Sequence, residues 1–166
     1  MGSPPTAAPA AHAPSGIHLD DGYQTLITFA ANNTIAFWEK SVKPPGMDGG
    51  DPIDTTTMHN DTWRTKAPRA LVSMTDLTIR AAYDPVLYDG ALVAGSVLSL
   101  LNVKTTVTVL FPDGTTLAFY GFLKNFEPGD HQEGAQPEAT ITVVVTNQDP
   151  SDGSEQDPVL DNAAGT

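Results

Sequence analysis

The four histidines are the side chains of this sequence best suited to acid–base or metal chemistry. His12 and His18 precede the first predicted strand, and His59 and His131 lie in predicted loops. None belongs to an HExxH or HxH pattern, which would bring two imidazoles to one metal ion. The chain has no cysteine, which excludes thiolate ligands and disulfides. We therefore expect isolated, solvated histidines rather than a metal centre.

Asp48, Asp51 and Asp54 recur at three-residue spacing in a glycine-rich stretch and could offer oxygen ligands to calcium. An EF-hand loop places its acids at alternate positions and ends in a glutamate, and that order is missing here. Solvated aspartates that form turns are the simpler interpretation. The sequence leaves open whether these three residues bind an ion.

Motifs for nucleophilic catalysis and nucleotide binding are missing. Gly95-Ser96 lacks the second glycine of a GxSxG elbow and lies in an apolar stretch. No GxGxxG or Walker sequence joins a predicted strand to a predicted helix. We predict that the protein is not an enzyme, with no catalytic residue, no cofactor and no resident metal.

The composition indicates strands, and the charge argues against nucleic-acid recognition. Only 17% of the residues are charged, against roughly 25% in soluble domains. Twenty acidic and eight basic residues give a net charge of -12, which repels phosphates. A surface past which DNA must slide without sticking is a different matter, and an acidic surface suits it.

The chain divides into three predicted segments. Residues 1–19 form a flexible arm rich in Pro and Ala, residues 20–147 form one domain, and residues 148–166 form an acidic tail that is flexible or draped on the surface. The start lacks the positive and apolar regions of a secretory signal, so we expect cytoplasmic synthesis. The apolar stretch Ala91–Leu101 is too short to cross a membrane, and no membrane contact is expected.

Alternating apolar residues predict an all-β domain. The runs Tyr23–Ala30 and Thr34–Lys43 are separated by three residues and predict a hairpin. Val103–Phe111 and Thr115–Phe126 flank a Pro-Asp-Gly turn and predict a second hairpin, and Ala139–Asn147 predicts a further strand. Together they predict a β-sandwich.

Other segments carry weaker signals. Tyr83–Leu101 predicts one short flanking helix, and Ala70–Ala82 predicts a strand. Residues Pro44–Thr62 predict a long irregular loop that returns through a short strand, Trp63–Ala67, as an extended flap with a paired base. Such a loop buries too little apolar surface to hold itself in place, so a partner must order it.

The polar faces of the strands are rich in threonine, as at Thr106, Thr108, Thr140 and Thr142. One interpretation is the ordinary solvent face of an antiparallel sheet. The other is an uncharged, nonadhesive lining of a channel formed when copies of the chain assemble edge to edge. The sequence does not decide between them.

Residues 83–150 resemble the major tail tube proteins of siphophages, which are long-tailed, non-contractile bacteriophages. The pieces that carry the resemblance keep their order and spacing over this stretch. They are Tyr83-Asp84-Pro85, Leu101-Asn102-Val103, Phe111-Pro112-Asp113-Gly114-Thr115, Tyr120-Gly121-Phe122-Leu123-Lys124, Phe126-Glu127-Pro128, Gln136-Pro137-Glu138-Ala139-Thr140 and Thr146-Asn147.

The resemblance implies a β-sandwich whose sheets close a barrel around a lumen, with hexameric rings stacked into the tail tube of a virion. DNA passes through the lumen without specific binding during genome ejection. The partners implied are a tape measure inside the lumen and terminator and distal tail proteins at the ends. A long loop after the first strands contacts the neighbouring ring, and we predict Ile53, Met58 and Trp63 as its contact residues.

Two other functions fit the pattern of strands. A monomeric immunoglobulin-like adhesion or carbohydrate-binding domain would share it, and so would another ring-forming protein such as a tail terminator or a type VI secretion tube protein. A stable monomer at high concentration would favour the first, and isolated rings without long tubes would favour a terminator.

Overall fold

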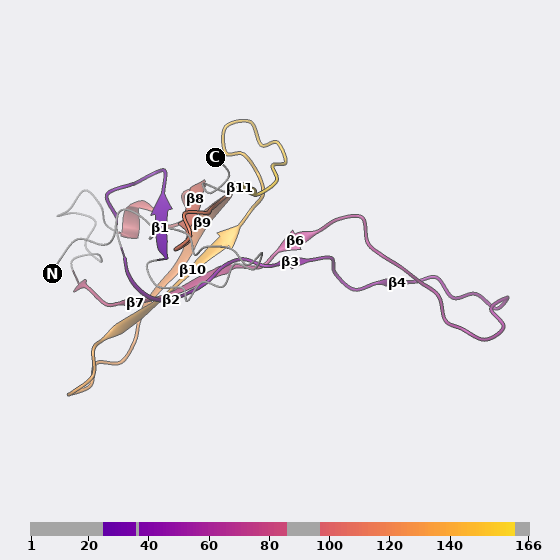
Figure 1. Cartoon of the computed structure of the whole chain (residues 1–166), viewed down its shortest axis with the longest axis horizontal. Coiled ribbons are helices and arrows are strands. Elements are labelled where there is room, and N and C mark those ends of the chain that lie inside the picture. The colour runs from indigo at the N-terminus through magenta and orange to yellow at the C-terminus, as the bar shows by residue number, and fades with distance from the viewer. Residues whose placement is uncertain (1–24, 36, 86–96, 162–166) are drawn as a thin grey trace.

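The computed structural model describes residues 25–35, 37–85 and 97–161, and almost all regular structure in these ranges is β-strand (Figure 1). The strands of the body are β1 (Leu26–Phe29), β2 (Trp38–Lys43), β7 (Leu77–Ala82), β8 (Thr105–Leu110), β9 (Thr116–Pro128), β10 (Glu138–Val145) and β11 (Val159–Asp161). Between β2 and β7 lie the short strands β3 (Met47–Asp48), β4 (Ile53–Asp54), β5 (Lys66–Ala67) and β6 (Ser73–Met74). The predicted all-β class is confirmed.

The body strands form one seven-stranded antiparallel sheet. Its order is β1-β8-β9-β10-β7-β2, and β11 pairs with the beginning of β9. The predicted hairpin of β8 and β9 is present, with Val109 opposite Leu117. Asp113 Oδ1 accepts the N–H of Thr115 at 2.8 Å, and Gly114 has a φ of 88°. Glycine adopts this left-handed conformation without strain, so the Asp-Gly pair fixes the turn.

One hydrophobic core lies on the inner side of this sheet. Burial alternates along β7, β8 and β10, so every second side chain of these strands points inward. The largest fully buried side chains are Phe29, Phe37, Ile27, Leu77, Ile79, Leu100, Leu123, Ile141, Val107, Val109 and Val143. Nine of them come from β1, β7, β8, β9 and β10, and Phe37 and Leu100 come from connecting segments. All belong to one cluster, so the sheet wraps around its own core.

The predicted hairpin between the first two strands is wrong. β1 pairs with β8 and β2 pairs with β7, so the two strands stand at opposite ends of the sheet order. The chain between them carries Ile35 and Phe37, both buried. Burial of these side chains draws the connection across the core instead of back along β1. The ring of Phe37 then meets Phe29 edge-on, with centroids 6.1 Å apart.

Several predicted boundaries also change. The predicted strand Ala70–Ala82 is divided into β6 and β7, and Trp63–Ala67 is reduced to β5. Most of the helix predicted over Tyr83–Leu101 lies outside the described residues, and its described end contains a 3-10 helix, η2 (Val97–Ser99). No helix among the described residues has the length and apolarity needed to span a membrane.

The acidic C-terminal segment returns to the sheet. β11 pairs with β9 in the register Val159 opposite Ala118, beyond the end of β10. Between β10 and β11 the chain forms a loop in which Asp149 N–H donates to the carbonyl of Ser154 at 2.9 Å. This loop lies beside the base of the segment that joins β2 to β7. Residues 1–19, predicted as a flexible arm, lie outside the described residues.

Candidate assembly surface

An extended hairpin, residues 44–76, projects from the body between β2 and β7 (Figure 1) and is called the arm from here on. At its base β3 pairs with β6, Met47 opposite Met74, and farther out β4 pairs with β5, Ile53 opposite Ala67. Gly46 N–H donates to Thr75 Oγ1 at 2.8 Å, close to the first ladder. The extended loop with a paired base that the sequence predicts is therefore present.

Polar side chains hold the tip of the arm. Thr57 N–H donates to Asn60 Oδ1 at 2.8 Å, and Asn60 Nδ2 donates to the carbonyl of Trp63 at 3.1 Å. Thr55 Oγ1 and Thr65 Oγ1 lie 3.0 Å apart across the two strands. Threonine and asparagine favour such local bonds. The outer arm thus keeps its shape through hydrogen bonds and not through a buried core of its own.

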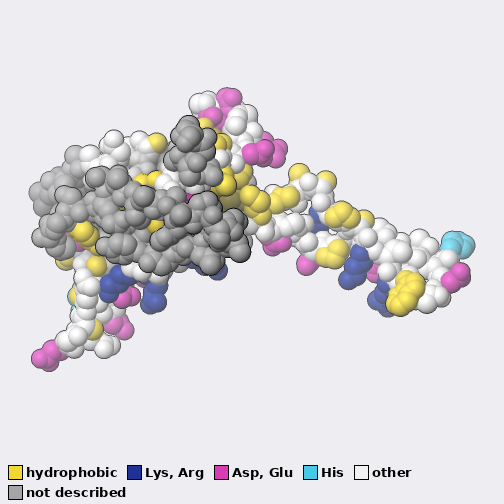
Figure 2. All heavy atoms as spheres, in the orientation of Figure 1, with side chains coloured by type: hydrophobic (Ala, Val, Ile, Leu, Met, Phe, Trp, Pro, Cys, Tyr) yellow, Lys and Arg dark blue, Asp and Glu magenta, His cyan; other side chains and the backbone are white. Residues whose placement is uncertain are grey.

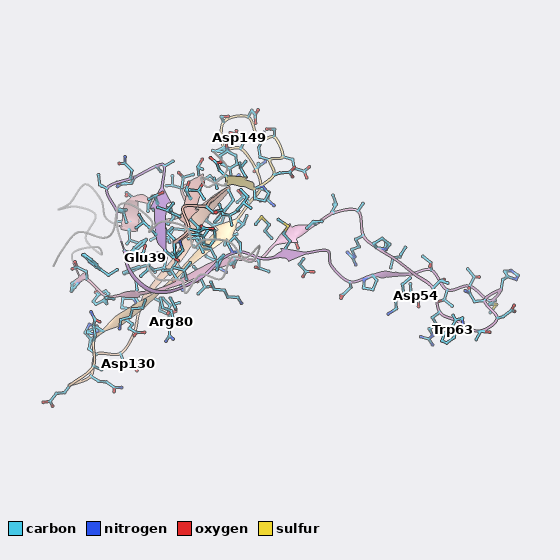
Figure 3. All side chains as sticks on the ribbon, in the orientation of Figure 1. Glu39, Asp54, Trp63, Arg80, Asp130 and Asp149 are labelled. Atoms are coloured by element: carbon cyan, nitrogen blue, oxygen red, sulfur yellow. The ribbon has the colours of Figure 1, made fainter. Side chains whose placement is uncertain are left out.

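The three predicted contact residues all lie in the outer part of this arm. Ile53 is 52% exposed, Met58 is fully exposed at 102% and Trp63 is 80% exposed. Figure 3 shows Trp63 near the far end, well away from the body. The structure therefore places these residues on one projecting element. Their contact with an adjacent ring stays a prediction.

The aspartates of the arm do not converge on an ion site. Asp48 and Asp54 each accept a backbone N–H two residues further on, at 2.8 and 2.9 Å. The bonds from Thr56 lower the pKa of Asp54. Asp51 offers its carbonyl oxygen to Arg69 Nε at 2.8 Å. Within residues 25–35, 37–85 and 97–161, no group of three or more His, Asp or Glu side chains could hold a metal ion. The geometry gives the possible ion site no support.

The histidines are also separate from one another. His59 is exposed at the tip of the arm. His131 packs edge-on against Tyr83, with ring centroids 5.3 Å apart. His12 and His18 lie outside the described residues. Neither described imidazole is therefore paired with the other for acid–base chemistry.

The two strands of the arm differ in charge. The charged residues of the outgoing side are all acidic, at Asp48, Asp51 and Asp54, and Asp61 follows the turn at the tip. The returning segment, Trp63–Arg69, carries Arg64, Lys66 and Arg69 and no acid. In Figure 2 basic and hydrophobic side chains lie close together on the outer arm. The returning segment is thus the cationic and aromatic part of an acidic protein.

The C-terminal segment 147–161 has the opposite charge, with five acids and no Lys or Arg. Asp149 Oδ1 accepts the N–H of Ser151 at 2.7 Å, and Asp152 Oδ1 accepts that of Ser154 at 2.8 Å. Hydrogen bonds from these serines lower the pKa of both aspartates, so both stay ionised at neutral pH. The hydroxyl of Tyr120 donates to Asp149 Oδ2 at 3.1 Å and fastens the loop to β9.

A pocket of about 410 Å³ lies where the base of the arm meets the C-terminal segment. Its lining residues are Met47, Ala70, Leu71, Val72 and Met74 from the arm and Asn147, Glu155, Gln156, Asp157 and Pro158 from the C-terminal segment. Asn147 has a φ of 48°, and its buried Oδ1 has no hydrogen-bond partner among the residues that the structure describes. The sequence could not predict this pocket, because its two walls lie far apart along the chain.

The face of the sheet turned away from the core is partly hydroxyl-rich and partly basic. Thr142 lies opposite Thr78, but Thr140 lies opposite Arg80. Glu138 forms salt bridges with two basic side chains, with Lys40 Nζ 2.8 Å from Oε1 and Arg80 Nη2 3.6 Å from Oε2. The hydrogen bond and charge of Lys40 lower the pKa of Glu138. The predicted threonine face is therefore not uniformly uncharged, since strand pairing places these basic residues on it.

No family model and no curated protein matches the sequence. Solved structures share the fold. A chain from the sheath/tube terminator structure of an extracellular contractile injection system has a TM-score of 0.58 at 11% identity, over 89% of this chain and 99% of that chain. A chain from the anti-feeding prophage baseplate, symmetrised six-fold, has a TM-score of 0.54 at 11% identity, over 98% of both chains.

A chain from the tail of the empty gene transfer agent particle, refined with C6 symmetry, has a TM-score of 0.52 at 10% identity. The match covers 77% of this chain and 95% of that chain. At these identities the likeness is one of fold. The protein thus has the fold of chains found in phage-like tail and injection assemblies.

Proposed function

We propose that the protein is a structural subunit of a virion tail, which forms hexameric rings that stack into a tube. The observation that carries the proposal is the arm, which projects from the sheet and holds Met58 and Trp63 almost fully exposed. Large apolar side chains gathered on a projecting element mark a protein–protein contact. The matched chains from six-fold assemblies support the same symmetry for this protein.

Ring formation and stacking require two different kinds of contact. A head-to-tail contact that closes in the plane gives a ring, and one that repeats along the axis gives a tube. The arm is the element suited to the axial contact, because it reaches beyond the body (Figure 1). DNA passes through the lumen during genome ejection, and the net charge of -12 disfavours specific DNA binding.

The further partners in this proposal are a tape measure inside the lumen and terminator and distal tail proteins at the ends of the tube. A second candidate is a tail terminator, since one matched chain comes from a sheath/tube terminator structure. A terminator would form rings that do not continue into long tubes. Electron microscopy separates the two, because a tube subunit gives continuous tubes on its own.

Light scattering during size-exclusion chromatography tests the ring. We expect a species with a mass near six times that of the 17.5 kDa chain, or larger stacks, in proportions that rise with protein concentration. The monomeric binding-module alternative requires one species of 17.5 kDa throughout. A monomer at every concentration would overturn the proposed function.

A further inference from the structure

The returning segment of the arm presents one large apolar side chain among basic ones. Trp63 is 80% exposed, and Arg64, Lys66 and Arg69 follow without an acid between them. Tryptophan and arginine are enriched among the residues that carry most of the binding energy of interfaces. The indole also has a polar edge, since its Nε1–H is a hydrogen-bond donor. An apolar surface bordered by acidic side chains would complement this segment.

The pocket at the base of the arm has these properties. Its apolar lining residues include Leu71 and Val72, which are 79% and 61% exposed. Its acidic lining residues are Glu155 and Asp157, and none of the lining residues that the structure describes is Lys or Arg. Asn147, a half-buried residue, also lines it. A volume of about 410 Å³ is ample for one indole side chain.

The arm cannot fill the pocket of its own chain. The pocket lies at the base of the arm, beside β3 and β6. Trp63 lies near the other end (Figure 3). The β4–β5 ladder and the bond from Arg69 Nε to the carbonyl of Asp51 hold the two strands together between these points. In the extended conformation Trp63 and the pocket of the same chain are held apart, so the occupant comes from another molecule.

We propose that this pocket receives Trp63 from the arm of a second copy of the chain, with Arg64 and Lys66 of that arm facing Glu155 and Asp157. The inference rests on the proposed self-assembly and assigns the receiving surface for the arm. The donating and receiving surfaces are different patches of one subunit, so the contact is heterologous and can repeat without limit. Repetition of this contact along one axis produces a stack.

Cysteine cross-linking tests the contact directly, because the protein has no cysteine of its own. Thr62→Cys places a thiol next to Trp63, and Gln156→Cys places one in the lining of the pocket; both positions are exposed. The two purified full-length variants are mixed and oxidised. We expect a disulfide-linked heterodimer at about tenfold or higher yield than with the matched control, because docking raises the effective concentration of the two thiols.

The matched control replaces Gln156→Cys by Gln132→Cys, an exposed residue of the loop that contains Asp130, at the end of the body opposite the arm (Figure 3). Adding Trp63→Ala to the Thr62→Cys variant should reduce the yield to that of the control. Circular dichroism verifies that all variants fold.

The result separates this inference from the proposed function. Equal yields with Gln156→Cys and Gln132→Cys, from a protein that still forms rings, would overturn the arm–pocket contact and leave the ring function intact. A specific cross-link in a protein that forms no ring would support the contact and overturn the tube function. Equal yields and no rings would overturn both.

Discussion

Glu39 Oε1 accepts the backbone N–H of Ile27 at 3.3 Å, so a side chain of β2 contacts the free edge of β1. These two strands are the outermost members of the sheet order, and no backbone ladder joins them. The carboxylate therefore bridges the two edges of the sheet where it curls around the core. Its position is half-buried, and this burial raises the pKa of Glu39 to about 6.

Glu39→Gln should make the protein more stable at neutral pH. Below the ordinary pKa of 4.5 the side chain is protonated in both folded and unfolded chains, so it adds no pH dependence there. Between pH 4.5 and about 6 the unfolded chain ionises first, and the free energy of unfolding falls as pH rises. Over this range the free energy of unfolding falls by about 1–2 kcal/mol, after allowance for the partial exposure of Glu39.

Glutamine removes this loss and keeps an oxygen that can accept the Ile27 N–H. Urea denaturation of both proteins between pH 4 and 7 measures the difference, with the exposed Glu133→Gln as the control. A Glu39→Gln variant whose stability relative to the parent is the same at pH 4 and pH 7 would contradict this account of the edge contact.

Gly121→Ala should destabilise the body. A Cβ at Gly121 would lie 2.6 Å from the carbonyl oxygen of Val144, a backbone atom of the neighbouring strand β10 that cannot move alone. Overpacking of this kind costs about 1–3 kcal/mol. Gly49→Ala is the matched control, since nothing lies within 4 Å of a Cβ at that position. Equal stability of the two variants in urea denaturation would show that β9 and β10 are farther apart than described.

Local patterns in the sequence predict the elements whose partners lie nearby in the chain. β8 and β9 are adjacent and joined by Asp113-Gly114, so alternation and turn chemistry together define that hairpin. The same reasoning predicts a hairpin of β1 and β2 that does not form. A local pattern contains no information on the pairing of Leu26 with the distant Leu110. Pairing between distant segments depends on burial in the whole core, which a local window does not contain.

The candidate site also has a part that the sequence predicts and a part that it does not. Ile53, Met58 and Trp63 could be named from the sequence, because large apolar residues in a polar loop need a partner. The pocket could not, because Leu71 and Glu155, which both line it, lie far apart along the chain. The bridge from Glu138 to Lys40 and Arg80 was equally hidden, since it depends on the order of β2, β7 and β10.

Shortening the arm should abolish stacking and preserve the fold. Replacing residues 50–69 by a short Gly-Ser turn keeps the β3–β6 ladder and residues 70–72 of the pocket. A shorter loop changes chain entropy by only about 0.6 kcal/mol for each twofold change in length, so thermal unfolding should stay nearly unchanged. Rings should survive, and tubes should be absent from electron micrographs. Long tubes from this folded variant would show that the arm does not join rings.

The basic part of the sheet should point away from the lumen of the tube. Lys40 and Arg80 surround Glu138, and Lys43 lies opposite Thr78 on the same face. Repeated around a ring, these side chains would attract DNA phosphates and slow their passage. A map of the assembled tube should show a neutral or acidic lining. A ring of Lys40 and Arg80 facing the channel would contradict this expectation.

Electron microscopy of the purified full-length protein over a range of concentrations tests self-assembly most directly. Our account predicts rings with six-fold symmetry that stack into continuous hollow tubes, with more and longer tubes as concentration rises. Two-dimensional class averages should show the arm of each subunit crossing to the next ring. Single particles of the size of one 17.5 kDa chain at every concentration, with neither rings nor tubes, would contradict it.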